Sequence, residues 1–158
     1  MQHLSVIHPK GADVTAKPTQ NEGEVDPRLN RQLAVELILG RQLASYLGVP
    51  IFLVDPRGDM VYYNEPAEAI LGIRFEETGR MPMEEWSRSF TPTDADGTPI
   101  EPDNLPLVVA LQEGRPDCEE FYIQGLDETT RHIQVIGIPV IGQAGKKLGA
   151  IAVLWEVE

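Results

Sequence analysis

Residues 50–72 read PIFLVDPRGDMVYYNEPAEAILG and contain enough local signals to predict a series of structural elements. Two apolar runs, 51–54 and 60–63, flank the segment DPRG, whose Asp, Pro and Gly residues favour a tight turn. Asn64 stands at the position of a helix N-cap, and Gly72 follows the last apolar residue of that helix. The stretch therefore predicts a strand, a turn, a second strand and a short helix.

A longer helix is predicted before this stretch. Asp26 can cap it, Pro27 occupies its first helical position, and Gly48 ends it. Its apolar residues cover about twice the arc of roughly 100° that a helix with one buried face requires. We therefore expect it to pack on its own domain and also on the same helix of a second chain. The residues expected in this dimer interface are Leu33, Val35, Leu39, Leu43 and Tyr46.

The sequence before and after this helix sets the expected domain boundaries. Residues 1–25 are polar, contain prolines and glycines and show no sustained periodicity, which predicts a disordered tail. We expect the N-terminal helix at 26–48 and one folded domain at 49–158. A chain of 158 residues has the size of one ordinary domain with extensions.

The second half of the chain gives less regular signals. Prolines and glycines between 73 and 102 break short helical turns, which predicts an irregular lid. A second helix is expected at 105–111, between Pro106 near its start and Gly114 after its end. The remaining residues predict three antiparallel strands at 119–124, 131–141 and 147–156.

This order of elements resembles the PAS sensor domain. The resemblance lies in IFLVDPRGDMVYYNEPAEAILG, in DADGTPIEPDNLPLVVALQEG and in the closing RHIQVIGIPVIGQAGKKLGAIAVLWEVE. The second fragment looks like a subgroup with D-x-D-G-x-P and L-P-x-x-x-A-L-x-x-G, of the stand-alone bacterial type. The resemblance implies an α+β fold, in which a five-stranded antiparallel sheet carries short helices on one face and follows an N-terminal helix. It also implies a sensor or protein-interaction module that often dimerises through the helix before the sheet.

Composition and charge exclude several classes of partner. The formal net charge of −12 at pH 7 repels nucleic acid and anionic lipid headgroups. The sequence has no long apolar run and no secretory signal at its start, so we expect a cytoplasmic protein without membrane contact. Cys118 and the scattered histidines His3, His8 and His132 do not form a spaced ligand cluster, so no metal is expected.

No cofactor is expected either. Haem-binding members of the family use a histidine on the main helix, whereas LPLVVALQEG contains none. Photosensory flavin members carry a reactive cysteine on an earlier helix, and the equivalent segment MPMEEWSRSF contains no cysteine. The resemblance therefore implies neither haem binding nor covalent flavin photochemistry.

A set of apolar and aromatic residues is expected to face the space between the sheet and the helices. Most of these side chains should form the core, and some would line a pocket for a small apolar ligand if the packing leaves one open. The candidate pocket residues are Leu53, Tyr63, Ala67, Leu71, Trp86, Phe90, Val108, Leu111, Phe121, Ile133, Val135 and Val153.

Three functions remain open from the sequence. A sensory module would bind a small molecule and signal as a homodimer or through a separate signalling protein. WEVE stands where many family members have an Asp-x-Thr junction, and we expect no effector domain in the chain. A ligand-free dimerisation or scaffold module would bind no small molecule. An enzyme would use Asp94, Asp96 and Tyr63 for proton transfer, but we expect none because no nucleophile paired with a base is visible.

Overall fold

The computed structural model describes the backbone of residues 27–158 and the side chains of residues 35–158. The expected tail at 1–25, the cap Asp26 and the side chain of Leu33 therefore lie outside the described residues. The elements are, in chain order, α1 (Pro27–Tyr46), β1 (Ile51–Val54), β2 (Met60–Tyr63), α2 (Glu65–Leu71), α3 (Phe75–Thr78), α4 (Met83–Ser89), η1 (Pro102–Asn104), α5 (Pro106–Glu113), β3 (Asp117–Gln124), β4 (Thr130–Ile141), η2 (Gln143–Gly145) and β5 (Lys147–Glu156).

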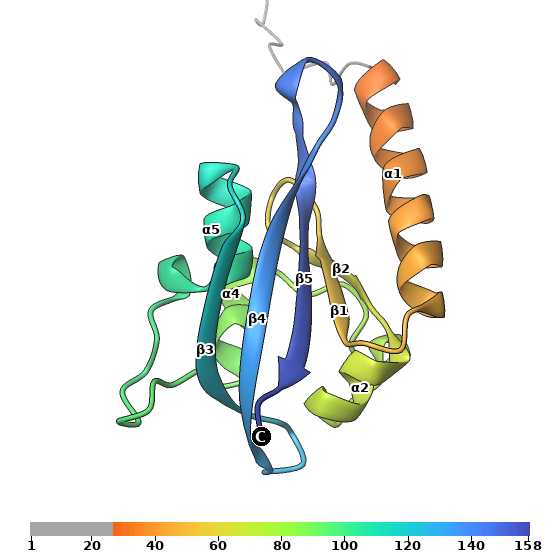
Figure 1. The fold of residues 1–158 in the computed structure, drawn as a ribbon. Helices are drawn as coiled ribbons and strands as arrows, with labels where there is room; N and C mark the ends of the chain where they lie inside the picture. Colours follow the sequence, from red (N-terminus) through yellow and green to blue (C-terminus); the bar gives the residue numbers. More distant parts are fainter. Residues whose placement is uncertain (1–26) are drawn as a thin grey trace, which may run out of the picture.

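The five strands form one antiparallel sheet in the order β2-β1-β5-β4-β3. Helices α2, α4 and α5 pack on one face, called the inner face here, and α1 packs on the other, called the outer face. Figure 1 shows α1 across the strands from α4 and α5. The expected α+β class, with short helices on one face and a preceding helix, is confirmed.

Strand β1 is buried on both faces, so the side chains of its consecutive residues pack into different layers. Phe52 and Val54 belong to the main core, whereas Leu53 packs on the outer face with Ala44 of α1. Val153 of β5 packs against the same outer cluster. The predicted pocket positions of Leu53 and Val153 are therefore wrong. The cause is physical: where a strand is apolar on both faces, the pattern of hydrophobicity does not reveal which residues face which layer.

The DPRG turn between β1 and β2 is fixed by the carboxylate of Asp55. Its Oδ1 accepts hydrogen bonds from the backbone amides of Arg57 (2.9 Å) and Asp59 (3.1 Å). Gly58 has a φ of 89°, a left-handed conformation that strains residues with a side chain. The carbonyl oxygen of Gly58 accepts a 2.9 Å hydrogen bond from Nε1 of Trp86. The turn therefore anchors α4 beside the sheet.

Asn64 is buried and connects three elements. Its Oδ1 accepts a hydrogen bond from the amide of Ala67, so the predicted cap of α2 is confirmed. The same oxygen accepts a 2.9 Å hydrogen bond from the amide of Ile51 in β1. Its Nδ2 donates to the carbonyl oxygens of Ala44 and Val49, both at 2.9 Å. Asn64 thus ties the C-terminal end of α1 to both the sheet and α2.

Candidate functional site

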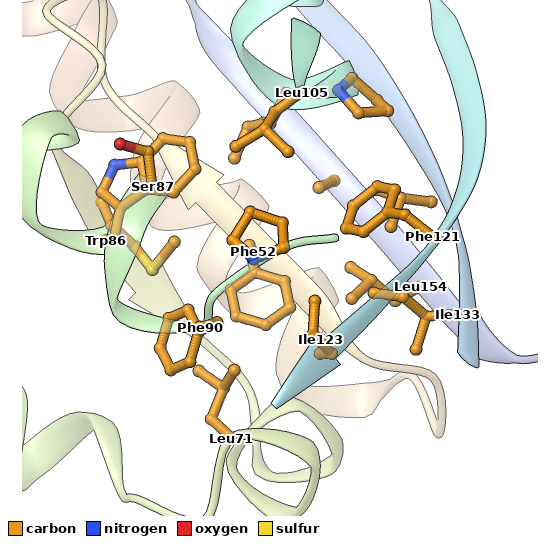
Figure 2. Close-up of a pocket in the computed structure, with 16 residues that line it drawn as sticks. Phe52, Leu71, Trp86, Ser87, Phe90, Leu105, Phe121, Ile123, Ile133 and Leu154 are labelled. Carbon is orange, nitrogen blue, oxygen red and sulfur yellow. The ribbon is translucent and has the colours of Figure 1, made fainter. Parts of the chain in front are cut away.

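An apolar cavity lies between the inner face of the sheet and the helical layer (Figure 2). Its volume is about 80 Å³. Strands, helices and irregular segments all contribute to its wall. The lining residues are Phe52, Met60, Leu71, Trp86, Ser87, Phe90, Pro92, Leu105, Pro106, Leu107, Phe121, Ile123, Ile133, Val135, Ala152 and Leu154.

The strand side of the cavity follows from the pairing register. Residues directly opposite each other in adjacent strands point to the same face of a sheet. Three such pairs line the cavity, namely Phe52 with Ala152, Phe121 with Ile133, and Val135 with Leu154. The register therefore gathers side chains from four strands into one continuous apolar surface.

The helical side of the cavity comes from α2, α4 and the start of α5, together with residues next to these helices. Trp86 and Ser87 lie on α4, and Phe90 directly follows it. Leu105 and Pro106 stand at the start of α5. Figure 2 shows the α4 residues facing Phe121, Ile133 and Leu154 across the cavity, with Phe52 between the two groups. The cavity thus lies between the strand layer and the helical layer.

The cavity wall carries almost no polar chemistry. Ser87, which is 3% exposed, is the one lining residue with a hydroxyl group. The indole Nε1 of Trp86 already donates its hydrogen bond to the carbonyl of Gly58. No carboxylate, ammonium, guanidinium or imidazole side chain is among the lining residues. The wall can therefore bind a molecule mainly through apolar contact.

The predicted pocket residues divide into three groups. Six of the twelve line the cavity, namely Leu71, Trp86, Phe90, Phe121, Ile133 and Val135. Four others lie in the same core without lining the cavity, namely Tyr63, Ala67, Val108 and Leu111. The remaining two, Leu53 and Val153, lie on the outer face.

Several lining residues were missed by the sequence reasoning, for two different reasons. Ile123 lies two positions after Phe121, so strand alternation was a signal that could have identified it. Leu154 was missed because its neighbour Val153 was assigned to the inner face instead. Pro92 and Leu105 come from irregular segments, where no periodicity indicates the direction of a side chain.

The three groups considered for proton transfer do not meet at the cavity. The hydroxyl of Tyr63 lies in the core, 2.9 Å from Oγ1 of Thr78 and 3.3 Å from the carbonyl oxygen of Ile73. Burial raises the pKa of Tyr63 above its usual value, which favours the protonated phenol. Asp94 and Asp96 are exposed and are not among the lining residues. The arrangement offers no base to a molecule in the cavity.

Helix α1 rests on the outer face through its smaller residues. Ala44 is buried against Ile51 and Leu53, and the Cα of Gly40 faces the side chain of Leu53. Five of the larger apolar residues of α1 lie on the surface, with exposed fractions from 51% to 80%. We call them the exposed α1 face; they are Val35, Ile38, Leu39, Leu43 and Tyr46. All but Ile38 were predicted for the dimer interface, whose fifth predicted member, Leu33, has no described side chain.

Three further features bear on partners and cofactors. Within residues 27–158, no helix is both long and apolar enough to cross a membrane. Among the side chains described, no group of three or more His, Cys, Asp and Glu residues is placed to hold a metal ion. Cys118 is exposed and forms no disulfide.

The fold and the cavity define a class of α+β domain in which an antiparallel sheet and a layer of short helices enclose an apolar space. Residues 39–157 match the sequence model of the PAS fold. The chain therefore belongs to the PAS family. No curated protein matches it.

Similar solved structures are PAS and LOV domains of low sequence identity. The PAS domain of BvgS from Bordetella pertussis is 19% identical, with a TM-score of 0.55, and the match covers 77% of this chain and 85% of that one. A PAS domain of an HTR-like protein from Haloarcula marismortui is 16% identical, with a TM-score of 0.52 and coverages of 84% and 100%. The Rhodobacter sphaeroides LOV protein is 14% identical, with a TM-score of 0.57 and coverages of 83% and 68%. These similarities show a shared fold.

Proposed function

We propose that this chain is a sensory and signalling module that works as a homodimer and acts through protein–protein interaction. The observation that carries the proposal is the exposed α1 face, where five large apolar side chains are each more than half exposed. Membership of the PAS family supports a sensory role. In this proposal the inner cavity is the site of a small apolar ligand, and α1 forms the dimer contact.

The exposed α1 face suits a second copy of the same helix. Contiguous apolar surface is unfavourable in water by about 25 cal/mol per Å² and commonly marks an interaction site. A two-fold dimer brings the same patch of both chains together, so each apolar residue finds apolar partners on the other copy. Leu39 and Leu43 lie near the middle of the described part of this face, which makes them the residues to test.

A physical connection links the cavity to α1. Phe52 lines the cavity, and the adjacent Leu53 packs against α1. Leu71 of α2 also lines the cavity, and Asn64 bonds both the start of α2 and the end of α1. A ligand that shifts β1 or α2 would therefore bias the position of α1, which is the coupling that a sensor requires.

A ligand-free dimerisation or scaffold module is the second candidate. The small volume of the cavity, about 80 Å³, favours it, since dimerisation through α1 needs no ligand. Other sequence-based expectations remain predictions: no enzymatic activity, a separate signalling protein as partner, a cytoplasmic location and the bacterial subgroup.

Sedimentation of the full chain tests the dimer. We expect a dimer in the native chain and a monomer after Leu39→Glu or Leu43→Glu, because an unpaired charge buried in an apolar contact costs several kcal/mol. Ala69→Glu adds the same charge to an exposed position of α2 and should leave the dimer intact. A native chain that stays monomeric at high micromolar concentration would contradict the proposal.

A further inference from the structure

Strand β3 forms one edge of the five-stranded sheet (Figure 1). Its pairing with β4 uses one side of its backbone, so the backbone groups on the other side point away from the sheet. Tyr122 identifies that side, because it exchanges two backbone hydrogen bonds of 2.9 Å with Thr93, which does not belong to β4. The backbone groups of Cys118 and Glu120 point the same way as those of Tyr122, since alternate residues of a strand share an orientation.

The second half of this edge is paired and the first half is open. Besides the bonds of Tyr122, the amide of Gln124 donates a 3.0 Å hydrogen bond to the carbonyl oxygen of Phe90. Among residues 27–158, the backbone N–H and C=O groups of Cys118 and Glu120 have no hydrogen-bond partner. Both residues are exposed. Unpaired backbone groups along a strand edge form a template to which another extended segment can add.

A groove lies beside the open part of the edge. It is bounded by β3, by α5 and by the irregular segment that leads into α5, and its volume is about 430 Å³. Three of its lining side chains are apolar, namely Ile100, Val109 and Phe121. A segment that paired with β3 would therefore also remove apolar surface from water, which favours its binding.

The groove is strongly acidic. The carboxylate side chains that line it are those of Asp94, Asp103, Glu113, Asp117, Glu119 and Glu120. Arg115 also lines the groove, and it already pairs with Glu113 and Asp117. Among the described lining residues, no lysine or second arginine balances the other four carboxylates. A surface with this excess of one charge attracts segments of the opposite charge and repels segments of the same charge.

The charge distinguishes between three kinds of occupant for the open edge. Two β3 edges from separate copies would bring their acidic side chains together, and like charges on neighbouring strands are unfavourable. Residues 1–26 of this chain contain two lysines against four Asp and Glu residues, so that segment offers no excess of positive charge. A basic, extended segment of a separate protein supplies both the backbone groups and the complementary charge.

We propose that the open edge of β3, at residues 117–121, binds an extended, basic segment of a separate protein, which adds to the sheet as a further strand. The backbone groups of Cys118 and Glu120 hydrogen-bond this segment, and its basic side chains lie beside the carboxylates of the groove. The open edge is separate from the exposed α1 face, so this inference goes beyond the proposed dimer and does not depend on it.

Strand addition is tested on the full chain with a short, end-blocked peptide of alternating lysine and valine, by NMR. The peptide should slow hydrogen exchange at the amides of Cys118 and Glu120, which should exchange fast in the chain alone. The amides of Glu119 and Phe121 face β4 and should keep their rates. Unchanged fast exchange at Cys118 and Glu120 would overturn the proposal. Slow exchange there without peptide would also overturn it, since the edge would then be occupied by residues 1–26 or by a second copy.

Two control peptides separate strand addition from attraction between charges. Methylation of the backbone amides keeps the lysine charges and removes the hydrogen-bond donors, so the methylated peptide should not protect Cys118 and Glu120. Replacement of each lysine by glutamate keeps the backbone and reverses the charge, which should abolish binding at the same salt concentration. Equal binding of the methylated peptide, or of the glutamate peptide, would overturn the proposal.

Cys118→Pro removes one edge donor from the chain itself. Proline has no amide hydrogen, and because this amide points away from β4, the substitution leaves the bonds between β3 and β4 in place. The lysine–valine peptide should bind about tenfold more weakly or worse, since it loses a hydrogen bond and meets the proline ring. Cys118→Ser keeps the amide and is the matched control, which should bind like the native chain. Equal binding by the two variants would overturn the proposal.

Glu120→Lys tests the charge of the groove, and it decides the matter if Cys118→Pro does not fold. It should weaken binding of the lysine–valine peptide several-fold at low salt, and the loss should shrink at high salt because salt screens exposed charges. Glu76→Lys makes the same change at an exposed position of α3 that does not line the groove, and it should bind nearly as well as the native chain. Equal losses in the two variants would show that only net charge matters and would overturn the proposal.

Failure of this inference can be told apart from failure of the proposed function. A chain that dimerises through α1 but does not bind the lysine–valine peptide would overturn the strand-addition proposal and leave the homodimer. A chain that binds the peptide at β3 but stays monomeric would support strand addition and contradict the homodimer.

Discussion

The two faces of the sheet bury apolar side chains in different ways. The inner face is closed by α2, α4 and α5, and twenty-two buried residues form one cluster there. On the outer side, a buried cluster of three residues joins α1 to the sheet, and α1 itself presents large apolar side chains to the surface. The inner face therefore supplies most of the stability of the domain, and the outer side leaves apolar surface of α1 exposed.

This difference arises within single strands. Phe52 and Leu53 are consecutive residues of β1, and one lines the cavity while the other packs under α1. Because alternate side chains of a strand point to opposite faces, β1 contributes side chains to both the inner and the outer layer. A substitution on the inner face should therefore change folding stability, and one on the outer face should mainly change how α1 is held.

The largest effect is expected at Gly137 of β4, where the inner face meets α5. An added Cβ would overlap the backbone carbonyl of Pro106 and come within 2.9 Å of the amide nitrogen of Leu107. This clash is with backbone atoms, so no side-chain rotation can relieve it. We expect Gly137→Ala to lower the free energy of unfolding by roughly 3 kcal/mol or more, as measured in urea.

Gly48→Ala is the matched control for this variant. A Cβ at Gly48, between α1 and β1, would have no neighbour within 4 Å. Its effect on the free energy of unfolding should stay within roughly 0.5 kcal/mol. Equal losses of unfolding free energy in the two variants would show that the clash with the backbone of Pro106 is not the reason for the effect of Gly137→Ala.

The next largest effect is expected at Asn64, which joins the two layers. Its side chain bonds backbone groups of α1, β1 and α2, and truncation leaves several of these buried groups without a partner. We expect Asn64→Ala to cost roughly 2–3 kcal/mol in urea unfolding, more than the roughly 1 kcal/mol of a simple helix cap. Hydrogen exchange should also become faster at the C-terminal end of α1. A loss of only about 1 kcal/mol of unfolding free energy, with unchanged hydrogen exchange in α1, would show that Asn64 contributes only as the N-cap of α2.

The sequence predicted those features that depend on neighbouring residues. The turn at DPRG, the cap at Asn64 and the stop at Gly72 are local signals, and each is found in the structure. The assignment of Leu53 failed because both faces of β1 are apolar, and only the pairing with β5 shows which side it occupies. The bonds from Asn64 to the end of α1 were not predictable either, since they join residues far apart in the sequence.

The composition of α1 illustrates the same limit. The wide apolar arc predicted two contact surfaces, and the structure shows the one on the sheet. The arc did not indicate which residues of α1 face the sheet. The helix docks through Ala44 and Gly40, whose small size allows close approach, and leaves the five residues of the exposed α1 face on the surface. Hydrophobicity alone would favour burial of the leucines. The observed orientation of α1 follows instead from the close approach of its small residues to the sheet.

A smaller and pH-dependent effect is expected at Tyr63 on the inner face. Its hydroxyl bonds Thr78 and the carbonyl of Ile73, while its ring packs on Phe52 and Phe75. Tyr63→Phe keeps the ring and should cost roughly 1 kcal/mol at neutral pH. Burial raises the pKa of Tyr63 in the folded chain, so its contribution is complete below the unfolded pKa and is lost as pH rises through the folded pKa.

Unfolding at about pH 8 and at about pH 10.5 measures this effect, because free tyrosine titrates near pH 10. The difference in stability between the native chain and Tyr63→Phe should narrow at the higher pH. The other titrating groups are common to both chains and cancel in the comparison. A difference that is constant with pH would show that the Tyr63 hydroxyl does not become harder to ionise on folding.

The smallest effect is expected at Arg41, which helps to hold α1 on the outer face. The Arg41 guanidinium carbon lies 4.8 Å from the centre of the Tyr62 ring, a cation–π contact at an exposed site. Such contacts contribute roughly 0.5–1 kcal/mol, and the higher helix propensity of alanine offsets part of the loss in Arg41→Ala. Global unfolding should therefore change by less than about 0.5 kcal/mol.

Local hydrogen exchange is the sensitive measurement for Arg41, because it detects opening of α1 separately from unfolding of the inner core. Arg41→Ala should speed exchange at the amides of α1 and leave those of β4 and β5 unchanged. Arg57→Ala, which removes an exposed arginine from the β1–β2 turn, is the control and should leave α1 unaffected. Faster exchange in α1 and in the central strands together would mean that α1 and the inner core open as one unit. In that case α1 would not be an independently held layer, and the contrast in stability between the two faces of the sheet would fail.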